Sequence, residues 1–295
     1  MMKNDSFSQY HPVTNFLFFV IALGTTMFIA QPVCLLISFL AACTYLLYLK
    51  GRKGLCRQLG YLFPLLLMMA VINPLFNHEG LTILCYLPND NPITLEAVVY
   101  GLFSAVLMGA SILWFQCCNE IFTSDKIIYL FGRVVPALSL LISMTLRFVP
   151  RFKTYLQNVV NVQKGFCEPR NTKEKIQQAF RAFSATVSWA MEQSIVSADS
   201  MKSRGFGLLG RTAYSIYSFE KRDRTAVLLL CLFTAATVLP FALNAMEWTY
   251  YPTFTGELWG WLQMTAYCCY AAVLLLPLTV DLMEDRKWNS LRSEI

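Results

Sequence analysis

Long apolar runs separated by short polar stretches set the pattern of this chain. A helix that spans a bilayer needs roughly 20 mostly apolar residues. Segments of this kind are each expected to form a transmembrane helix, and they cover residues 13–30, 32–49, 59–76, 96–117, 226–243 and 258–280. The first two are separated only by Gln31-Pro32, which predicts a tight helical hairpin. We therefore expect an all-α polytopic membrane protein with about six transmembrane helices.

A different pattern follows between about residues 150 and 205, where apolar residues recur every three or four positions. One helical face comprises Phe148, Phe152, Tyr155, Leu156, Val159 and Val160. The apolar stripe of a second helix comprises Ile176, Phe180, Phe183, Val187, Ala190, Ala198 and Met201. Asn171, with Glu174 three positions later, predicts an N-cap, and Gly165 and Gly205 predict the C-terminal ends. We expect two long amphipathic helices here.

The composition agrees with a membrane location. Hydrophobic residues make up 56% of the chain and charged residues only 14%, whereas soluble domains are about a quarter charged. The polar N-terminus has no basic stretch or cleavage site typical of a signal peptide, so none is expected.

Lysine and arginine are unevenly distributed among the polar segments. One lies at the N-terminus, four in 50–58, sixteen in 118–225 and three in the C-terminal tail, which accounts for all 24. The segments 77–95 and 244–257 contain none. Because basic loops remain in the cytoplasm, this distribution predicts an even number of spans with both termini cytoplasmic.

A further apolar stretch at 134–149 is interrupted by a proline and an arginine. As a seventh span it would place part of the basic residues on the wrong side of the membrane. We therefore favour a helix that is buried against other helices or lies partly in the membrane interface. The expected organisation is a four-span block at 1–118, a cytoplasmic or interfacial segment at 119–225 that holds the amphipathic helices, and a two-span block at 226–295.

No pattern for catalysis or metal binding is found. The ten cysteines include no C-x-x-C pair, and neither histidine has metal-ligand spacing to them. The motifs H-E-x-x-H, G-x-S-x-G and G-x-x-x-x-G-K-[ST] are absent. Carboxylates near the spans are confined to Glu96 and Asp281, whereas transport paths for ions usually carry charges inside the membrane. We expect no enzyme activity, no cofactor and no ATP hydrolysis by this chain.

Both amphipathic helices are predicted to end in a cation followed by glycine, at Lys164-Gly165 and Arg204-Gly205. A cation in the last turn complements the negative end of the helix dipole, and this needs no partner. A projecting arginine can also bind a carboxylate of another protein through two parallel hydrogen bonds. On the residues alone, the two interpretations carry equal weight.

Several stretches, in this order and spacing, resemble the T component of energy-coupling factor (ECF) transporters. They are NPLFNHEGLTIL (73–84), ITLEAVVYGL (93–102), RVVPALSLLISMTLRFVPRF (133–152) and SMKSRGFG (200–207). The resemblance implies a transmembrane scaffold, in a bacterial cell membrane, that joins two cytoplasmic ABC-type ATPases to a small membrane S component. The S component captures a vitamin or metal ion, the ATPases bind the ATP, and no nucleic-acid partner is implied. The alternatives are a permease subunit of another ABC importer and, after it, an intramembrane enzyme.

In this family each of two coupling helices ends in X-Arg-Gly, which docks in a groove on an ATPase. The resemblance assigns one docking end to Ser203, Arg204 and Gly205, and the other to Gln163, Lys164 and Gly165. Lys164 keeps the charge but lacks the planar fork of arginine, so we expect Arg204 to be the stronger anchor. Ala198 and Met201 are expected to pack near the dock, where Ala198 would permit a close approach.

Small residues gather in the fourth predicted span, and they permit helices to approach closely. They are Gly101, Ser104, Ala105, Gly109 and Ala110. They indicate either internal packing or a surface for the S component.

Overall fold

The computed structural model describes residues 6–86, 92–132, 135–166, 171–208, 217–243, 246, 248–251, 253–256 and 259–293. The chain divides into two compact units. We call Met1–Thr123 with Tyr217–Ile295 the bundle unit, and Ser124–Ile216 the arm unit. The two predicted transmembrane blocks therefore lie together in the bundle unit.

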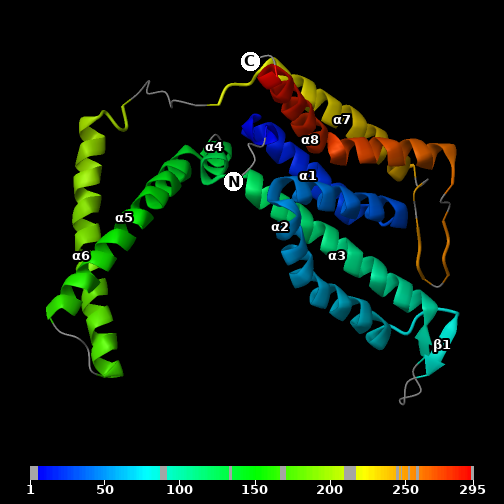
Figure 1. The fold of residues 1–295 in the computed structure, drawn as a ribbon, viewed down its shortest axis with the longest axis horizontal. Coiled ribbons are helices and arrows are strands. Elements are labelled where there is room, and N and C mark those ends of the chain that lie inside the picture. Colours follow the sequence, from blue (N-terminus) through cyan, green and yellow to red (C-terminus); the bar gives the residue numbers. More distant parts are fainter. Residues whose placement is uncertain are drawn as a thin grey trace. The chain divides into compact units, whose positions relative to one another are not determined.

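The bundle unit is built from apolar helices that pack on one another (Figure 1). They are α1 (Pro12–Phe28), α2 (Pro32–Phe76), α3 (Leu95–Ile121), α7 (Lys221–Ala242) and α8 (Trp261–Ser293). Among the described residues, four helices, namely α2, α3, α7 and α8, are long and apolar enough to cross a membrane, and α1 is a shorter apolar helix. The architecture is that of an all-α membrane protein.

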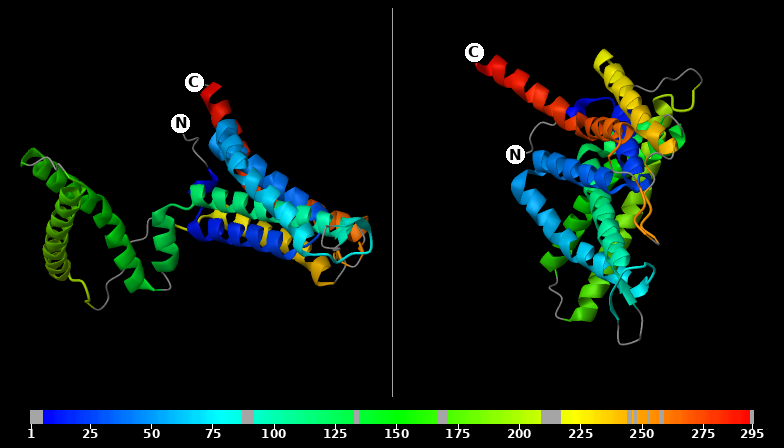
Figure 2. Two further views of the ribbon diagram at one scale, coloured as in Figure 1. Left: turned by 90° about the horizontal axis from the view of Figure 1, so that it is seen from below. Right: turned by 90° about the vertical axis from the view of Figure 1, so that its right-hand side faces the viewer.

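Helix α2 contains two of the predicted spans, 32–49 and 59–76, in one element of 45 residues. Gly51, with φ 71° and ψ 176°, interrupts the helical backbone, and the two legs meet there at a sharp bend (Figure 2). Only glycine adopts this conformation without steric cost. The expectation of a loop over 50–58 was wrong, because the chain is helical on both sides of this single residue.

A short antiparallel hairpin lies between α2 and α3, formed by β1 (Ile83–Tyr86) and β2 (Pro92–Thr94). The hydropathy and charge patterns of the sequence did not predict this hairpin. Glu96, at the start of α3, accepts a 2.7 Å hydrogen bond from the Thr82 hydroxyl. The hairpin is thus tied to the end of the bundle.

The core of the bundle unit centres on Trp114 of α3, which is fully buried. Its ring lies edge-on to Phe18 of α1 at 5.7 Å. Its Nε1 donates to Ser38 Oγ of α2 at 3.0 Å, and that hydroxyl lies 2.7 Å from Thr26 Oγ1 of α1. Because a buried polar group is costly unless it is hydrogen-bonded, this chain of donors and acceptors favours one packing of α1, α2 and α3.

The small residues of α3 serve internal packing. A Cβ added to Gly101 would lie 2.8 Å from the carbonyl oxygen of Ala70 on α2. A Cβ on Gly109 would lie 3.2 Å from Leu66, also on α2. Gly101, Ala105, Gly109 and Ala110 are all buried. The alternative expectation, a surface for the S component, was wrong for these four residues because they are buried inside the bundle unit.

Two buried carboxylates bind the backbone of the N-terminal segment, which includes the short helix η1 (Phe7–Gln9). Asp281 of α8 accepts from the Phe7 amide at 2.8 Å. Asp223 of α7 accepts from the His11 amide at 2.9 Å and from the Glu220 amide at 3.0 Å. These carboxylates therefore hold the segment against the start of α7 and the C-terminal half of α8.

The arm unit contains α4 (Ser124–Gly132), α5 (Pro136–Phe166) and α6 (Thr172–Ser203). The apolar stretch predicted at 134–149 begins α5, which continues through Pro150 without a break; Val134 itself lies outside the described residues. Leu138, Leu141 and Val149 are 46%, 58% and 59% exposed. Burial against other helices of the arm unit was therefore wrong for these side chains, and a position in the membrane interface stays a prediction.

Candidate functional site

Helices α5 and α6 cross and are held together by aromatic side chains (Figure 1). Trp189 of α6 stacks on Tyr155 of α5 with ring centroids 4.3 Å apart and planes only 6° from parallel. Its edge also meets Phe152 at 5.7 Å. Ala182 and Thr186 are buried beside it, where their small size lets the helices approach. The face predicted for α5 is confirmed, because its six residues are all half-buried.

The stripe predicted for α6 faces α5 only in part, because Phe183, Val187 and Ala190 lie at the helix crossing on the side of α5. Ile176, Phe180 and Phe183 are 54%, 70% and 62% exposed. Trp189 lies outside the predicted stripe, and together with Ala182 and Thr186 it defines the buried face instead. The stripe therefore remains a long exposed apolar surface.

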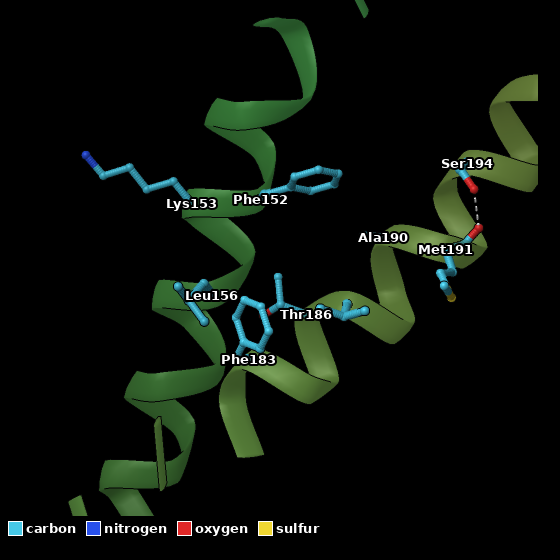
Figure 3. A pocket seen from close by; sticks show the side chains of 9 residues that line it. Phe152, Lys153, Leu156, Phe183, Thr186, Ala190, Met191 and Ser194 are labelled. Carbon is cyan, nitrogen blue, oxygen red and sulfur yellow. Dashed lines mark hydrogen bonds between the residues drawn. The ribbon is translucent and has the colours of Figure 1, made fainter. Parts of the chain in front are cut away.

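Part of that stripe forms one wall of an open groove of about 520 Å³ at the helix crossing. Figure 3 shows Phe152 and Leu156 of α5 next to Phe183 and Thr186 of α6. Lys153, the charged residue of the lining, points away from the groove (Figure 3). The lining lacks a pair of titratable groups for acid–base chemistry, so the groove suits an apolar surface rather than a reacting substrate.

The C-terminal end of α6 is closed by a Schellman motif. The Phe206 amide donates to the Met201 carbonyl at 3.0 Å, and the Gly205 amide donates to the Lys202 carbonyl at 3.0 Å. Gly205 has φ +77°, which other residues rarely adopt. The prediction of a glycine C-cap at this position is confirmed.

Arg204 occupies the C-cap position of this motif and its side chain is exposed. Within the part of the chain that the structure describes, no acidic side chain forms an ion pair with it. Ser203 donates its hydroxyl to the Ser200 carbonyl at 2.9 Å, which occupies its side chain within the helix. The guanidinium is therefore available to a partner, as is the exposed ammonium of Lys202.

The end of α5 is built differently. Helix α5 continues through Gly165 to Phe166, and Gly165 is not among the glycines with positive φ. The expectation that Gly165 is a C-cap was wrong. Lys164 is exposed, whereas Gln163 is half-buried and its Oε1 has no hydrogen-bond partner among the described residues. Lys164 therefore projects from a regular helical turn.

The two cation-bearing ends lie at opposite ends of α6. Helix α5 ends at Phe166, close in sequence to the start of α6 at Thr172, and Arg204 follows the other end. The 32 residues of α6 correspond to a length of about 48 Å. The structure thus separates Lys164 and Arg204 by roughly the length of this helix.

Ala198 and Met201, which were expected to pack near the dock, differ in their burial. Met201 is half-buried, but Ala198 is exposed, so the structure shows no close helix approach at Ala198. Asn171 does occupy the N-cap of α6, but its side chain makes no capping hydrogen bond.

Comparison with known proteins does not add to this picture. No protein-family model matches the chain, and no curated protein matches its sequence. No group of three or more metal-ligating side chains is found among the residues that the structure describes.

Sequence reasoning missed Trp189 and the aromatic residue after each glycine. Phe166 follows Lys164-Gly165 and is 84% exposed, and Phe206 follows Arg204-Gly205 and is 50% exposed. The parallel between Lys-Gly-Phe and Arg-Gly-Phe is visible in the sequence. Their exposure required the structure.

Proposed function

We propose that this chain is the transmembrane scaffold subunit of an ECF-type ABC importer. It couples ATP hydrolysis by two cytoplasmic ATPases to a membrane S component for uptake of a vitamin or metal ion. The observation that carries the proposal is the end of α6, where a Schellman motif presents an exposed Arg204 without an acidic partner among the described residues.

The arrangement of the arm unit supports force transmission. A stiff helix transmits displacement along its axis, and α6 is held at its middle by the stack of Trp189 on Tyr155. Two ATPases need two docking points, and the ends at Lys164 and Arg204 provide them on opposite ends of α6. A push on one end therefore reaches the crossing where α5 and α6 meet.

The S component is an integral membrane protein, so it offers apolar helix surfaces. The groove at the α5–α6 crossing and the exposed stripe of α6 are the matching apolar surfaces on this chain. This assignment replaces the one to α3, whose small residues are covered by α2. Under the positive-inside rule, the arm unit and both termini lie in the cytoplasm of a bacterial cell, and the bundle unit spans its inner membrane.

Co-purification tests the proposal. The tagged full chain is expressed with candidate ATPase subunits, and the native chain is compared with Arg204→Glu, Lys164→Glu and the control Arg181→Glu. Arg181 is an exposed arginine on the same helix, away from both ends. We expect Arg204→Glu to lose most ATPase, because reversing one charge of a docked ion pair costs several kcal/mol, on the order of 2–5.

Membrane insertion and elution volume must be the same for all variants. Retention of ATPase by Arg204→Glu at the level of the native chain would refute the docking role. Equal losses for Arg204→Glu and Arg181→Glu would show a general charge effect and would also count against it.

A further inference from the structure

A cluster of cations lies at the sharp bend of α2, and we call it the elbow. Lys50 ends the first leg of the helix, and Arg52, Lys53 and Arg57 belong to the start of the second leg. The two legs meet at Gly51 (Figure 2). All four cations therefore lie within about two helical turns of the bend.

Lys50 is occupied within the bundle unit. Its Nζ lies 2.6 Å from Oε1 of Glu120 on α3. A Cβ on Gly54 would lie 2.5 Å from the Cβ of Lys50, so the missing side chain at position 54 makes room for the lysine. The other three cations are exposed, and none of them forms an ion pair with a residue that the structure describes. The elbow thus presents three positive charges to its surroundings.

Two of these cations share a helical face with an aromatic ring. Lys53, Arg57 and Tyr61 follow one another at intervals of four residues, which places them in one row along the second leg. Tyr61 is 72% exposed, and the leg continues with the exposed side chains of Phe63 and Leu67. The order along the leg is two cations, an amphipathic ring and then apolar side chains. A lipid presents its headgroup, glycerol region and acyl chains in the same order, and tyrosine is enriched at the boundary between them.

The length of the first leg locates the elbow relative to a bilayer. Residues 32–50 form a helix about 28 Å long, close to the hydrocarbon thickness of roughly 30 Å. A leg that starts at one surface of the hydrocarbon layer therefore ends at the other surface, where the second leg turns back. Lipid headgroups with their phosphates occupy this depth, which favours a lipid over a soluble protein as the ligand of the elbow.

We propose that the elbow of α2 binds the headgroup of an anionic phospholipid. Lys53 and Arg57 bind the phosphate, Arg57 through its planar fork, and Arg52 adds to the positive potential. Clusters of lysine and arginine next to a transmembrane helix attract anionic lipids in this way. The proposal goes beyond the proposed function and does not depend on it, because it uses only residues of the bundle unit.

The start of α7 separates such a site from the general preference of basic residues for one face of a membrane. Lys221 and Arg224 are also exposed cations near the end of an apolar helix. Two carboxylates lie beside them in sequence, Glu220 and the buried Asp223, and they offset this charge. A general preference would act on both pairs of cations, whereas the proposed site requires only the pair at the elbow.

Native mass spectrometry of the full chain in detergent, titrated with phosphatidylglycerol, tests the proposal. The variant Lys53→Gln/Arg57→Gln is compared with the native chain and with the control Lys221→Gln/Arg224→Gln, which removes the same charge. A cation near an anionic lipid surface contributes about fivefold in affinity. We therefore expect the elbow variant to bind phosphatidylglycerol about 25-fold more weakly and the control to bind it as the native chain does. All three chains should have the same elution volume and unfolding midpoint, since the changed side chains are exposed.

Several results would overturn the lipid site. Equal losses in the two double variants would show a general charge effect, and failure of the native chain to retain phosphatidylglycerol would refute binding altogether. Equal binding of phosphatidylcholine would show that the negative charge is not recognised. Displacement of the lipid by inorganic phosphate would identify a free anion as the ligand. Unchanged lipid binding by the elbow variant, together with loss of ATPase in co-purification, would assign the elbow to a protein partner.

Discussion

Removing the carboxylate of Asp223 should loosen the N-terminal segment from the bundle unit. This side chain is 2% exposed and accepts two backbone amides, from His11 at 2.9 Å and from Glu220 at 3.0 Å. It also forms the capping box of α7 with Glu220. Asp223→Ala leaves both amides without this acceptor.

The size of the effect follows from these two hydrogen bonds. A hydrogen bond to a charged group contributes about 1.5–3 kcal/mol. Part of this is offset because a carboxylate no longer has to be taken out of water, so we expect a net loss of about 3 kcal/mol in the free energy of unfolding. For a chain of this size, that lowers the midpoint of thermal unfolding by about 5 °C.

Thermal unfolding in detergent measures this shift through cysteines that the chain already has. Cys34 and Cys117 are free thiols that are 1% and 0% exposed. A thiol-reactive dye labels the exposed cysteines at once, and the further labelling of these two on heating reports the opening of the core. Asp223→Asn keeps an acceptor oxygen but not the charge, and should show a smaller shift. Asp199→Ala removes an exposed carboxylate from α6 and should show none.

Hydrogen exchange locates the effect. The amides of His11 and Glu220 should exchange faster in Asp223→Ala, while the protection of the α5–α6 crossing should stay unchanged. An unfolding midpoint of Asp223→Ala within about 1 °C of native, with these amides still protected, would show that the carboxylate does not hold the segment.

Other predictions concern the arm unit. Trp189→Ala should destabilise the α5–α6 crossing by about 3 kcal/mol through the lost stack on Tyr155, seen as faster amide exchange in both helices. Gly205→Ala should destabilise the end of α6 by about 1 kcal/mol because φ is +77° there. Gly165→Ala should instead stabilise α5 by about 0.5–1 kcal/mol, because Gly165 lies inside a regular helix with open space around it. Amide exchange at the two helix ends measures both effects. Lys164→Arg should raise ATPase retention in competition with the native chain, and no gain would count against the weaker-anchor interpretation.

Much of the fold could be anticipated from local pattern. Every predicted apolar segment is helical for most of its length, since apolar runs of this length have few other ways to satisfy their backbone. The packing face of α5 was also correct, because its apolar residues and its partner-facing residues coincide. The bend at Gly51 and the β1–β2 hairpin were missed, because each depends on backbone conformations that neither hydropathy nor charge reports.

The face of α6 illustrates the limit of periodicity. Its apolar stripe and its buried face are different sets of residues, and a pattern of apolar positions does not say which neighbour covers them. The small residues of α3 raised the same ambiguity between internal packing and an external surface, and contact with α2 resolved it. For the docking ends, the sequence located both cations, but only the structure distinguished the Schellman end at Arg204 from the continuous helix at Lys164.

The sequence by itself determined the class of this protein: apolar runs long enough to cross a bilayer, two amphipathic helices between them, and a cation followed by glycine near the end of each. These properties are local, because they depend on residues close together in the chain. The tertiary structure decided which surfaces remain exposed, namely most of the stripe of α6, the groove at the crossing and the ring of Phe166. Exposure is set by residues that are distant in the chain: Trp189 of α6 stacks on Tyr155 of α5, while Ile176 and Phe180 of the stripe stay exposed.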